Sequence, residues 1–147
     1  MSHDSLTDRA FQEQITAFIR AFGLHRPEQT PCGEPVSVAE AHALMELSRA
    51  APLSQNDLAH RLQLEKSTIS RLVALLEGRA WITRTRSSRD GRVIELRLTT
   101  AGRQAAAQLA VARQAKFVRL LGAIPENQRP AILEALRLLT EALDGQQ

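Results

Sequence analysis

Small polar and cationic side chains gather in the middle third of the chain, and they are the residue types that bind nucleic acid. Residues 66–71 place a lysine, three hydroxyl residues and an arginine within six positions. A guanidinium group donates two parallel hydrogen bonds to a guanine edge or a phosphate, which an ammonium group cannot reproduce. Residues 84–92 add four more arginines. We expect DNA contacts from Ser54, Gln55, Lys66, Ser67, Thr68, Ser70, Arg71, Arg84, Arg86, Arg89 and Arg92.

The positive charge of the chain is concentrated in the same region. The 147 residues carry a net charge of only +3, yet residues 61–103 hold ten Lys or Arg against four Asp or Glu, while residues 1–60 hold four against eight. Of the 19 cationic residues 17 are arginine, a total that a GC-rich coding bias would also produce. The position of the arginines, rather than their number, therefore predicts a nucleic-acid face.

Helical periodicity places the hydroxyl residues and Arg71 on the second helix of a pair. Ser54 is typical of an N-cap and Asp57 stands at the third helical position, so a short helix should follow and end near Leu62. A second helix over residues 65–78 carries small residues around Arg71 on one face, which permits close approach to another surface. We expect its buried face to consist of Ile69, Leu72, Val73 and Leu76.

After Trp81 the apolar period changes from 3.6 to 2, which predicts a β-hairpin with an arginine-bearing tip at residues 87–92. Helix, three-residue turn, helix and hairpin is the order of a winged helix-turn-helix, whose second helix enters the DNA major groove. The alternative is the same motif used for protein contact, with the arginines as a solvated face. We expect the buried face of the hairpin to consist of Ile82, Ile94, Leu96 and Leu98.

Amphipathic helices are predicted on both sides of this motif. The patterns favour a first helix over residues 5–23, which a capping box of Ser5 and Asp8 begins, and another over residues 36–50. After the hairpin, Thr99 should cap a long helix that reaches Gly122. A last helix should span residues 126–143 with Pro130 in its first turn, where the missing N–H is harmless.

The apolar stripes of the terminal helices have no further layer of sequence to cover them, so we expect a homodimer. The predicted fold is mainly α with a small β-hairpin wing. It consists of an N-terminal dimerisation helix and loop (residues 1–35), a winged helix-turn-helix DNA-binding region (residues 36–100) and C-terminal dimerisation helices (residues 101–147).

Four segments, taken in order, resemble the multiple-antibiotic-resistance regulator (MarR) family: residues 62–77, Trp81-Ile82, Arg89-Asp90-Gly91-Arg92 and Leu98-Thr99-Thr100-Ala101-Gly102. The resemblance implies a homodimeric transcription regulator that reads a pseudo-palindromic operator in double-stranded DNA. It also implies that Arg92 reaches the minor groove and that Asp90 stabilises the wing by pairing with arginines. In such regulators a small ligand in a cleft beside the DNA-binding lobe changes the separation of the two recognition helices, which favours a repressor that an effector relieves.

The cleft of this chain is expected near His25, Cys32, His42 and Met45. Cys32, Glu40 and His42 are also weak candidates for a zinc site, because zinc-sensing members of the family use such residues from this region. Those members take further histidines from the long fifth helix, and residues 99–122 contain none. A thiol switch at Cys32 stays open, although the tyrosines of peroxide-sensing members are missing here. No resident cofactor is expected, with zinc as the open alternative.

Other classes of protein find little support in the sequence. Cys32 and His42 could in principle form a nucleophile and base, but there is no phosphate-cradling glycine loop and no paired-carboxylate motif, so an enzyme is not expected. No apolar run is long enough for a membrane span, and the first residues do not form a secretory signal. The expected location is the cytoplasm.

Overall fold

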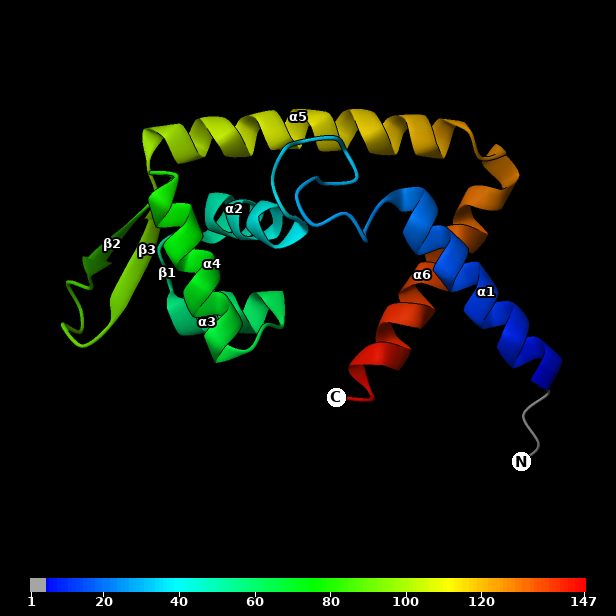
Figure 1. The fold of residues 1–147 in the computed structure, drawn as a ribbon, viewed down its shortest axis with the longest axis horizontal. Helices are drawn as coiled ribbons and strands as arrows, with labels where there is room; N and C mark the ends of the chain where they lie inside the picture. Colours follow the sequence, from blue (N-terminus) through cyan, green and yellow to red (C-terminus); the bar gives the residue numbers. More distant parts are fainter. Residues whose placement is uncertain (1–4) are drawn as a thin grey trace. The chain divides into compact units, whose positions relative to one another are not determined.

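The computed structural model describes residues 5–147. The chain divides into two compact units, the first ending at Ala112 and the second running from Arg113 to Gln147. Helix α5 crosses the boundary between them (Figure 1). The elements, in chain order, are α1 (Ser5–Phe22), α2 (Val38–Ala50), β1 (Leu53–Ser54), α3 (Gln55–Leu62), α4 (Lys66–Gly78), β2 (Ile82–Arg86), β3 (Ile94–Leu98), α5 (Thr100–Gly122), the 3₁₀ helix η1 (Glu126–Gln128) and α6 (Arg129–Asp144).

Helices α2, α3 and α4 lie together beside a small antiparallel sheet, as a winged helix-turn-helix requires (Figure 1). The strand order is β1-β3-β2, and the register pairs Leu53 with Leu96 and Ile82 with Leu98. The predicted hairpin is therefore confirmed. The sequence analysis missed β1, because two residues are too short to show an alternating pattern.

The core of the first unit forms where these elements meet. Leu44 and Leu47 of α2, Leu58 of α3 and Leu96 of β3 are each at most 2% exposed. The predicted buried face of α4 is confirmed, since Ile69, Leu72, Val73 and Leu76 all belong to this core. One face of α4 is thereby fixed against the protein, and the opposite face is left to solvent.

The predicted start of α2 and the predicted burial of Ile94 were wrong. Helix α2 begins at Val38 rather than Val36, because the Ser37 hydroxyl accepts a hydrogen bond from the Glu40 N–H at 3.1 Å and so caps the helix. Ile94 is 37% exposed rather than buried. It pairs with Arg86 at the end of the hairpin farthest from the Ile82–Leu98 pair, where the core no longer covers the sheet.

The hairpin and α5 are joined by a cap that the sequence predicted. The Thr99 hydroxyl accepts a hydrogen bond from the Gly102 N–H at 2.9 Å and donates one to the Ala80 carbonyl at 2.7 Å. The Thr99 N–H also donates to the Trp81 carbonyl at 2.9 Å. The residue before α5 is thus hydrogen-bonded to Trp81, the residue that directly precedes β2.

The second unit contains the end of α5, η1 and α6. Pro130 lies in the first turn of α6, as predicted. Arg137 bonds to both Glu134 and Glu141 on the surface of this helix; its hydrogen bond lowers the pKa of Glu134, and both bonds raise the pKa of Arg137. The predicted apolar stripe of α6 is exposed in the single chain at Ile132 and Leu136.

The structure also covers the start of the chain in part. Helix α1 has the predicted extent to within one residue, but the Ser5 side chain of the expected capping box lies outside the described residues. Phe11 and Phe18 of α1 are exposed. Among residues 5–147, no helix is both long and apolar enough to cross a membrane.

Candidate nucleic-acid interface

The solvent face of α4 carries the side chains that the sequence analysis assigned to base contacts. Ser67, Ser70 and Arg71 are exposed, and Thr68 is half-buried. Because neighbouring positions on the helix are fixed in the core, these side chains have a defined direction relative to the rest of the first unit. Serine and threonine are short enough for a helix carrying them to enter a groove, and one arginine can reach a guanine edge.

The turn before α4 sets the angle at which this helix leaves α3. Gln63 adopts a left-handed conformation with φ of 54°, and its N–H donates to the His60 carbonyl at 3.2 Å. The Leu64 N–H donates to the Ala59 carbonyl at 3.0 Å. These bonds end α3 within the predicted three-residue turn and start the second helix at Lys66.

Ser54 and Gln55, at the start of α3, have roles inside the protein as well. The Ser54 hydroxyl accepts a hydrogen bond from the Asp57 N–H at 3.0 Å, which confirms the predicted N-cap. The Gln55 side-chain oxygen accepts a long hydrogen bond of 3.5 Å from Arg84. The Ser54 hydroxyl still has its own proton to donate to a phosphate.

Arg84 is the candidate DNA contact that differs most from its expected state. Its Nε lies 2.6 Å from a carboxylate oxygen of Glu77, near the end of α4, and the ion pair is half-exposed. The sequence analysis missed this pair, because it depends on how β2 packs against α4. The Nε of Arg84 is therefore already engaged by Glu77.

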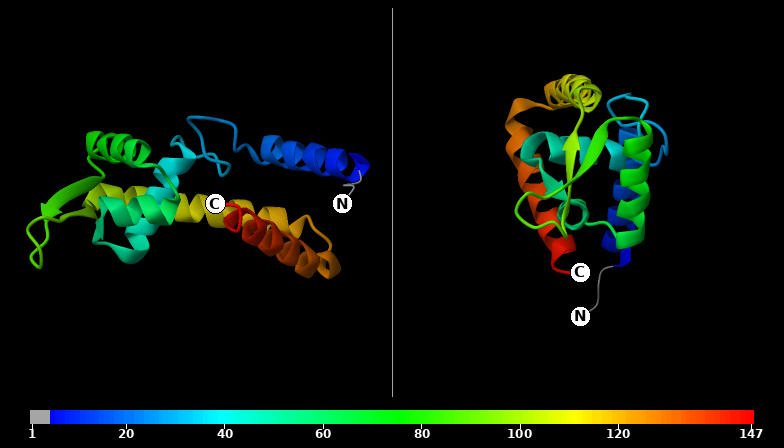
Figure 2. Two further views of the ribbon diagram at one scale, coloured as in Figure 1. Left: turned by 90° about the horizontal axis from the view of Figure 1, so that it is seen from below. Right: turned by 90° about the vertical axis from the view of Figure 1, so that its left-hand side faces the viewer.

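The tip of the hairpin is ordered by hydrogen bonds among its own residues. Asp90 Oδ1 accepts from the Arg92 backbone N–H at 3.0 Å and from Arg92 Nε at 3.2 Å. Arg86 donates to the Gly91 carbonyl at 2.8 Å, and the Ser87 hydroxyl accepts from the Arg89 N–H at 3.1 Å. The hairpin extends past α3 and α4, so its loop lies at an extremity of the first unit (Figure 2).

Three cations on this surface have no carboxylate to neutralise them. Within residues 5–147, the side chains of Lys66, Arg71 and Arg89 form neither an ion pair nor a hydrogen bond. The Arg92 side chain is 92% exposed in spite of its contact with Asp90. The unpaired cations thus lie at the start of α4, on its exposed face and at the hairpin tip, which suits a phosphate-rich partner.

The residues expected at the effector cleft have different surroundings in the first unit. Cys32 Sγ lies 3.0 Å from the hydroxyl of the buried Thr30, in the loop before α2. His25 and His42 are exposed, and Met45 packs against the core. None of the four side chains belongs to the walls of the two hollows that Glu34 lines.

The candidate zinc site is not formed in the single chain. Among the described residues, no three His, Cys, Asp or Glu side chains are placed to hold a metal ion. Glu40 has another role, because its carboxylate pairs with Arg79 at 2.6 Å and also accepts a hydrogen bond from the Ser37 N–H. Cys32, Glu40 and His42 are consequently not brought together in the single chain.

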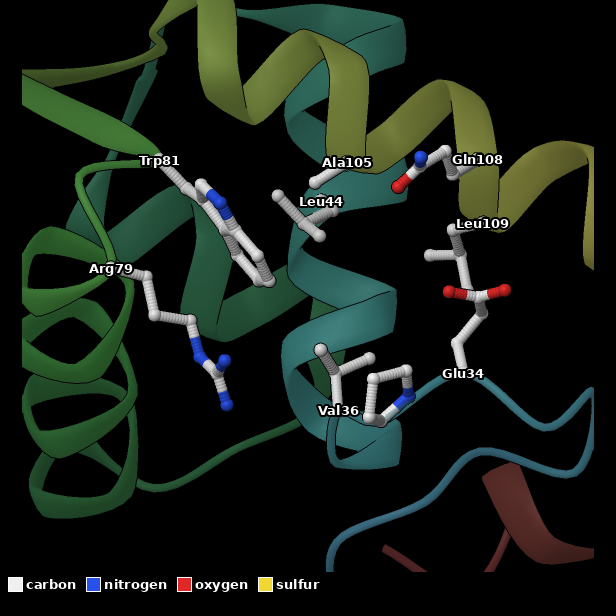
Figure 3. Close-up of a pocket in the computed structure, with 9 residues that line it drawn as sticks. Glu34, Val36, Leu44, Arg79, Trp81, Ala105, Gln108 and Leu109 are labelled. Carbon is white, nitrogen blue, oxygen red and sulfur yellow. The ribbon is translucent and has the colours of Figure 1, made fainter.

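A pocket that the sequence analysis missed lies between α2, the residues before β2 and the first half of α5 (Figure 3). It has a volume of about 140 Å³. No pattern in the sequence links its residues, which come from a loop, two helices and a strand end. The walls are formed by Glu34, Pro35, Val36, Leu44, Arg79, Trp81, Ala105, Gln108 and Leu109.

Comparison with known proteins finds similarity to transcription regulators. Residues 35–93 match the sequence profile of the MarR family. The HTH-type transcriptional repressor MdtR of Bacillus subtilis is 28% identical over 93 residues, which span 63% of this chain and 60% of MdtR. The match therefore covers less than two thirds of the length of that repressor.

Solved structures share the fold over nearly the whole chain. The PcaV transcriptional regulator from Streptomyces coelicolor, in complex with its natural ligand, has a TM-score of 0.74 at 21% identity and covers 97% of this chain and 99% of its own. FabT of Streptococcus pneumoniae, in complex with DNA, has a TM-score of 0.74 at 20% identity, and the match covers 98% of this chain and 100% of FabT. At these identities the likeness establishes the fold alone.

Proposed function

Because residues 35–93 of this chain match the sequence model of the MarR family, we propose that the protein is a transcription regulator that binds specific sequences in double-stranded DNA. The observation that carries the proposal is the exposed face of α4, where Ser67, Ser70 and the unpaired Arg71 stand on a helix fixed from behind by the core. This helix enters the major groove, and its side chains read base edges. Neither this chain nor the relatives named above suggest an enzyme.

The hairpin tip acts on the flanking DNA. Arg89 and Arg92 enter the minor groove, whose negative potential is strongest where the groove is narrow. Asp90 holds the loop in the shape that presents these two side chains. Lys66 and the first backbone N–H groups of α4 bind phosphate.

The protein acts as a homodimer on a pseudo-palindromic operator in the cytoplasm. The support is the exposure of large apolar side chains on α1, the end of α5 and α6, which a second copy would cover. Twofold symmetry then sets the two half-sites roughly 10 base pairs apart, centre to centre. The side chains assigned to this interface are Phe11, Phe18, Phe117, Leu120, Leu121, Leu133, Leu136 and Leu143.

The regulator is a repressor that a small effector relieves. MdtR is a repressor, PcaV was solved with its natural ligand, and the pocket beside Trp81 offers a place for an effector in this chain. An effector acts by changing the separation of the two recognition helices, since a shift of a few ångströms spoils their fit to successive major grooves.

The experiment that tests the proposal selects genomic fragments with the purified protein and then measures the affinity for the best fragment at several salt concentrations. If each subunit neutralises about three to five phosphates, the slope of log K against log salt should be about −5 to −9 for the dimer. A shuffled duplex of the same composition should bind much more weakly. Equal affinity for both duplexes, or no duplex binding at low salt, would overturn the proposal.

A further inference from the structure

We propose that the pocket beside Trp81 binds a small organic cation with one aromatic ring, which the Glu34 carboxylate and the Trp81 ring hold. This inference rests on the proposed function, because it names the chemical class of the effector. Three properties of the pocket favour such a ligand: its size, its free charge and the aromatic ring in its wall.

The size of the pocket suits a ligand with a single ring. A cavity of about 150 Å³ lined by apolar side chains accommodates benzene, and this pocket has about 140 Å³. Val36, Leu44 and Leu109 contribute to the apolar wall, and Leu44 is almost fully buried. A ring that displaces water from these side chains gains the hydrophobic free energy of burial.

The free charge in the pocket is negative. The half-buried Glu34 carboxylate forms no ion pair or hydrogen bond within residues 5–147. The charge of Arg79 is already compensated, because its Nε lies 2.6 Å from Glu40, whose side chain is only 7% exposed. Gln108 is neutral, and its side-chain amide can donate a hydrogen bond or accept one. An ammonium group therefore finds a partner in Glu34, whereas a carboxylate would be repelled by it.

The Trp81 ring gives the pocket a second affinity for cations. The indole extends into the pocket, and Glu34 lies across from it (Figure 3). The ring already attracts one cation, since the Arg79 guanidinium carbon lies 4.9 Å from its centroid. Tryptophan offers the most favourable face for such contacts, and it also stacks against a flat ring.

Occupancy of this pocket is connected to the DNA-binding surface through the chain itself. Arg79 is the C-cap of α4, and Trp81 directly precedes β2. The Trp81 carbonyl also accepts the Thr99 N–H at the start of α5. A ligand that moves the Trp81 ring or competes for Arg79 therefore acts on the end of the recognition helix and the base of the hairpin.

The test uses the intrinsic fluorescence of the full-length protein, because Trp81 is its one tryptophan and it has no tyrosine. Emission is titrated at pH 7 with phenethylamine, 3-phenylpropionate and 2-phenylethanol, which share a ring and a two-carbon chain but differ in charge. We expect a saturable change of Trp81 emission with phenethylamine, at an affinity at least tenfold above that of 3-phenylpropionate. Equal or tighter binding of the anion, or no saturable change with the amine, overturns the proposal.

Two variants of Glu34 test whether its carboxylate binds the ammonium group. Glu34→Gln should weaken the binding of phenethylamine at least tenfold and leave the affinity for 2-phenylethanol unchanged. Glu34→Asp should retain part of the preference for the amine over the anion. Glu28→Gln, in the same loop but outside the pocket, is the matched control and should change nothing. An unchanged amine affinity in Glu34→Gln, with circular dichroism like that of the wild type, would also overturn the proposal.

Binding of the selected duplex is measured on the same samples, so that the two proposals fail separately. A protein that binds its operator without a saturable amine signal contradicts the ligand class and leaves the regulator in place. A protein that binds the amine at Glu34 without binding any duplex contradicts the proposed function. Phenethylamine should also lower operator affinity in the wild type but not in Glu34→Gln, and an unchanged operator affinity at saturating phenethylamine would contradict its class as the effector.

Discussion

Gly102 in the first turn of α5 lies directly against the backbone of Trp81. A Cβ added at Gly102 would lie 2.0 Å from the Trp81 carbonyl oxygen and 2.9 Å from its carbonyl carbon. No side-chain rotation relieves such a contact, since both atoms belong to the backbone. The close approach allows the Thr99 N–H to reach the Trp81 carbonyl, which joins the wing to α5.

Gly102→Ala should therefore destabilise the protein strongly. Overpacking against rigid backbone costs about 1–3 kcal/mol, and we expect the upper end of this range because the start of α5 must shift. The measurement is urea unfolding at one fixed protomer concentration. Gly78→Ala is the control, because a Cβ there meets nothing within 4 Å. Equal stability of the two variants would contradict the contact.

The ion pair of Glu40 and Arg79 should contribute to stability through the buried carboxylate. Arg79 Nε lies 2.6 Å from Glu40 Oε2 but is not aligned with it, so this oxygen accepts no hydrogen bond and depends on the ion pair alone. Arg79→Met should cost about 1–2 kcal/mol, a value reduced for the partial exposure of Arg79. Adding Glu40→Gln should recover part of the loss in a double-mutant cycle, and an additive result would argue against the pair.

Local signals in the sequence were sufficient for most of the fold. The N-cap at Ser54 and the apolar repeat from Ile69 to Leu76 act within one or two helical turns, so they could be predicted from neighbouring residues. The site was predicted less completely. The pairing of Arg84 with Glu77 and the meeting of Glu34 with Trp81 depend on the angles between packed elements, which no local pattern contains.

Two arginines that were both predicted to contact DNA, Arg71 and Arg84, differ in whether a packed neighbour pairs with them. Arg71 is exposed and unpaired among the described residues, whereas Arg84 is neutralised by Glu77. Arg71→Ala should weaken operator binding by about 1–3 kcal/mol and relax specificity at one base pair. Arg84→Ala should have a smaller effect, because binding through Arg84 first requires breaking its ion pair. Fluorescence anisotropy with labelled operator and single-base variants measures both, and a larger loss for Arg84→Ala would reverse the assignment.

Asp90 offers a test in which charge and order act in opposite directions. Asp90→Ala adds a positive charge to the wing but removes the acceptor of two hydrogen bonds from Arg92. We expect operator affinity to fall about tenfold, because the loop must then be ordered on binding. Glu95→Ala adds the same charge on β3, outside the loop, and should bind as well as the wild type or better. Tighter binding by Asp90→Ala would mean that charge alone governs the wing.

The last prediction concerns the apolar face of α6, where Leu136 is 48% exposed in the single chain. If a second copy covers this face, Leu136→Glu places a charge in the interface and should shift the protein from dimer to monomer. Operator affinity should fall with it, because the two half-sites no longer bind as one unit. Sedimentation equilibrium measures the first effect and anisotropy the second. Glu134→Leu is the reciprocal control on the same helix. It removes a charge that pairs with Arg137 on the surface and should keep the dimer intact. A dimeric Leu136→Glu would show that copies of this chain associate elsewhere.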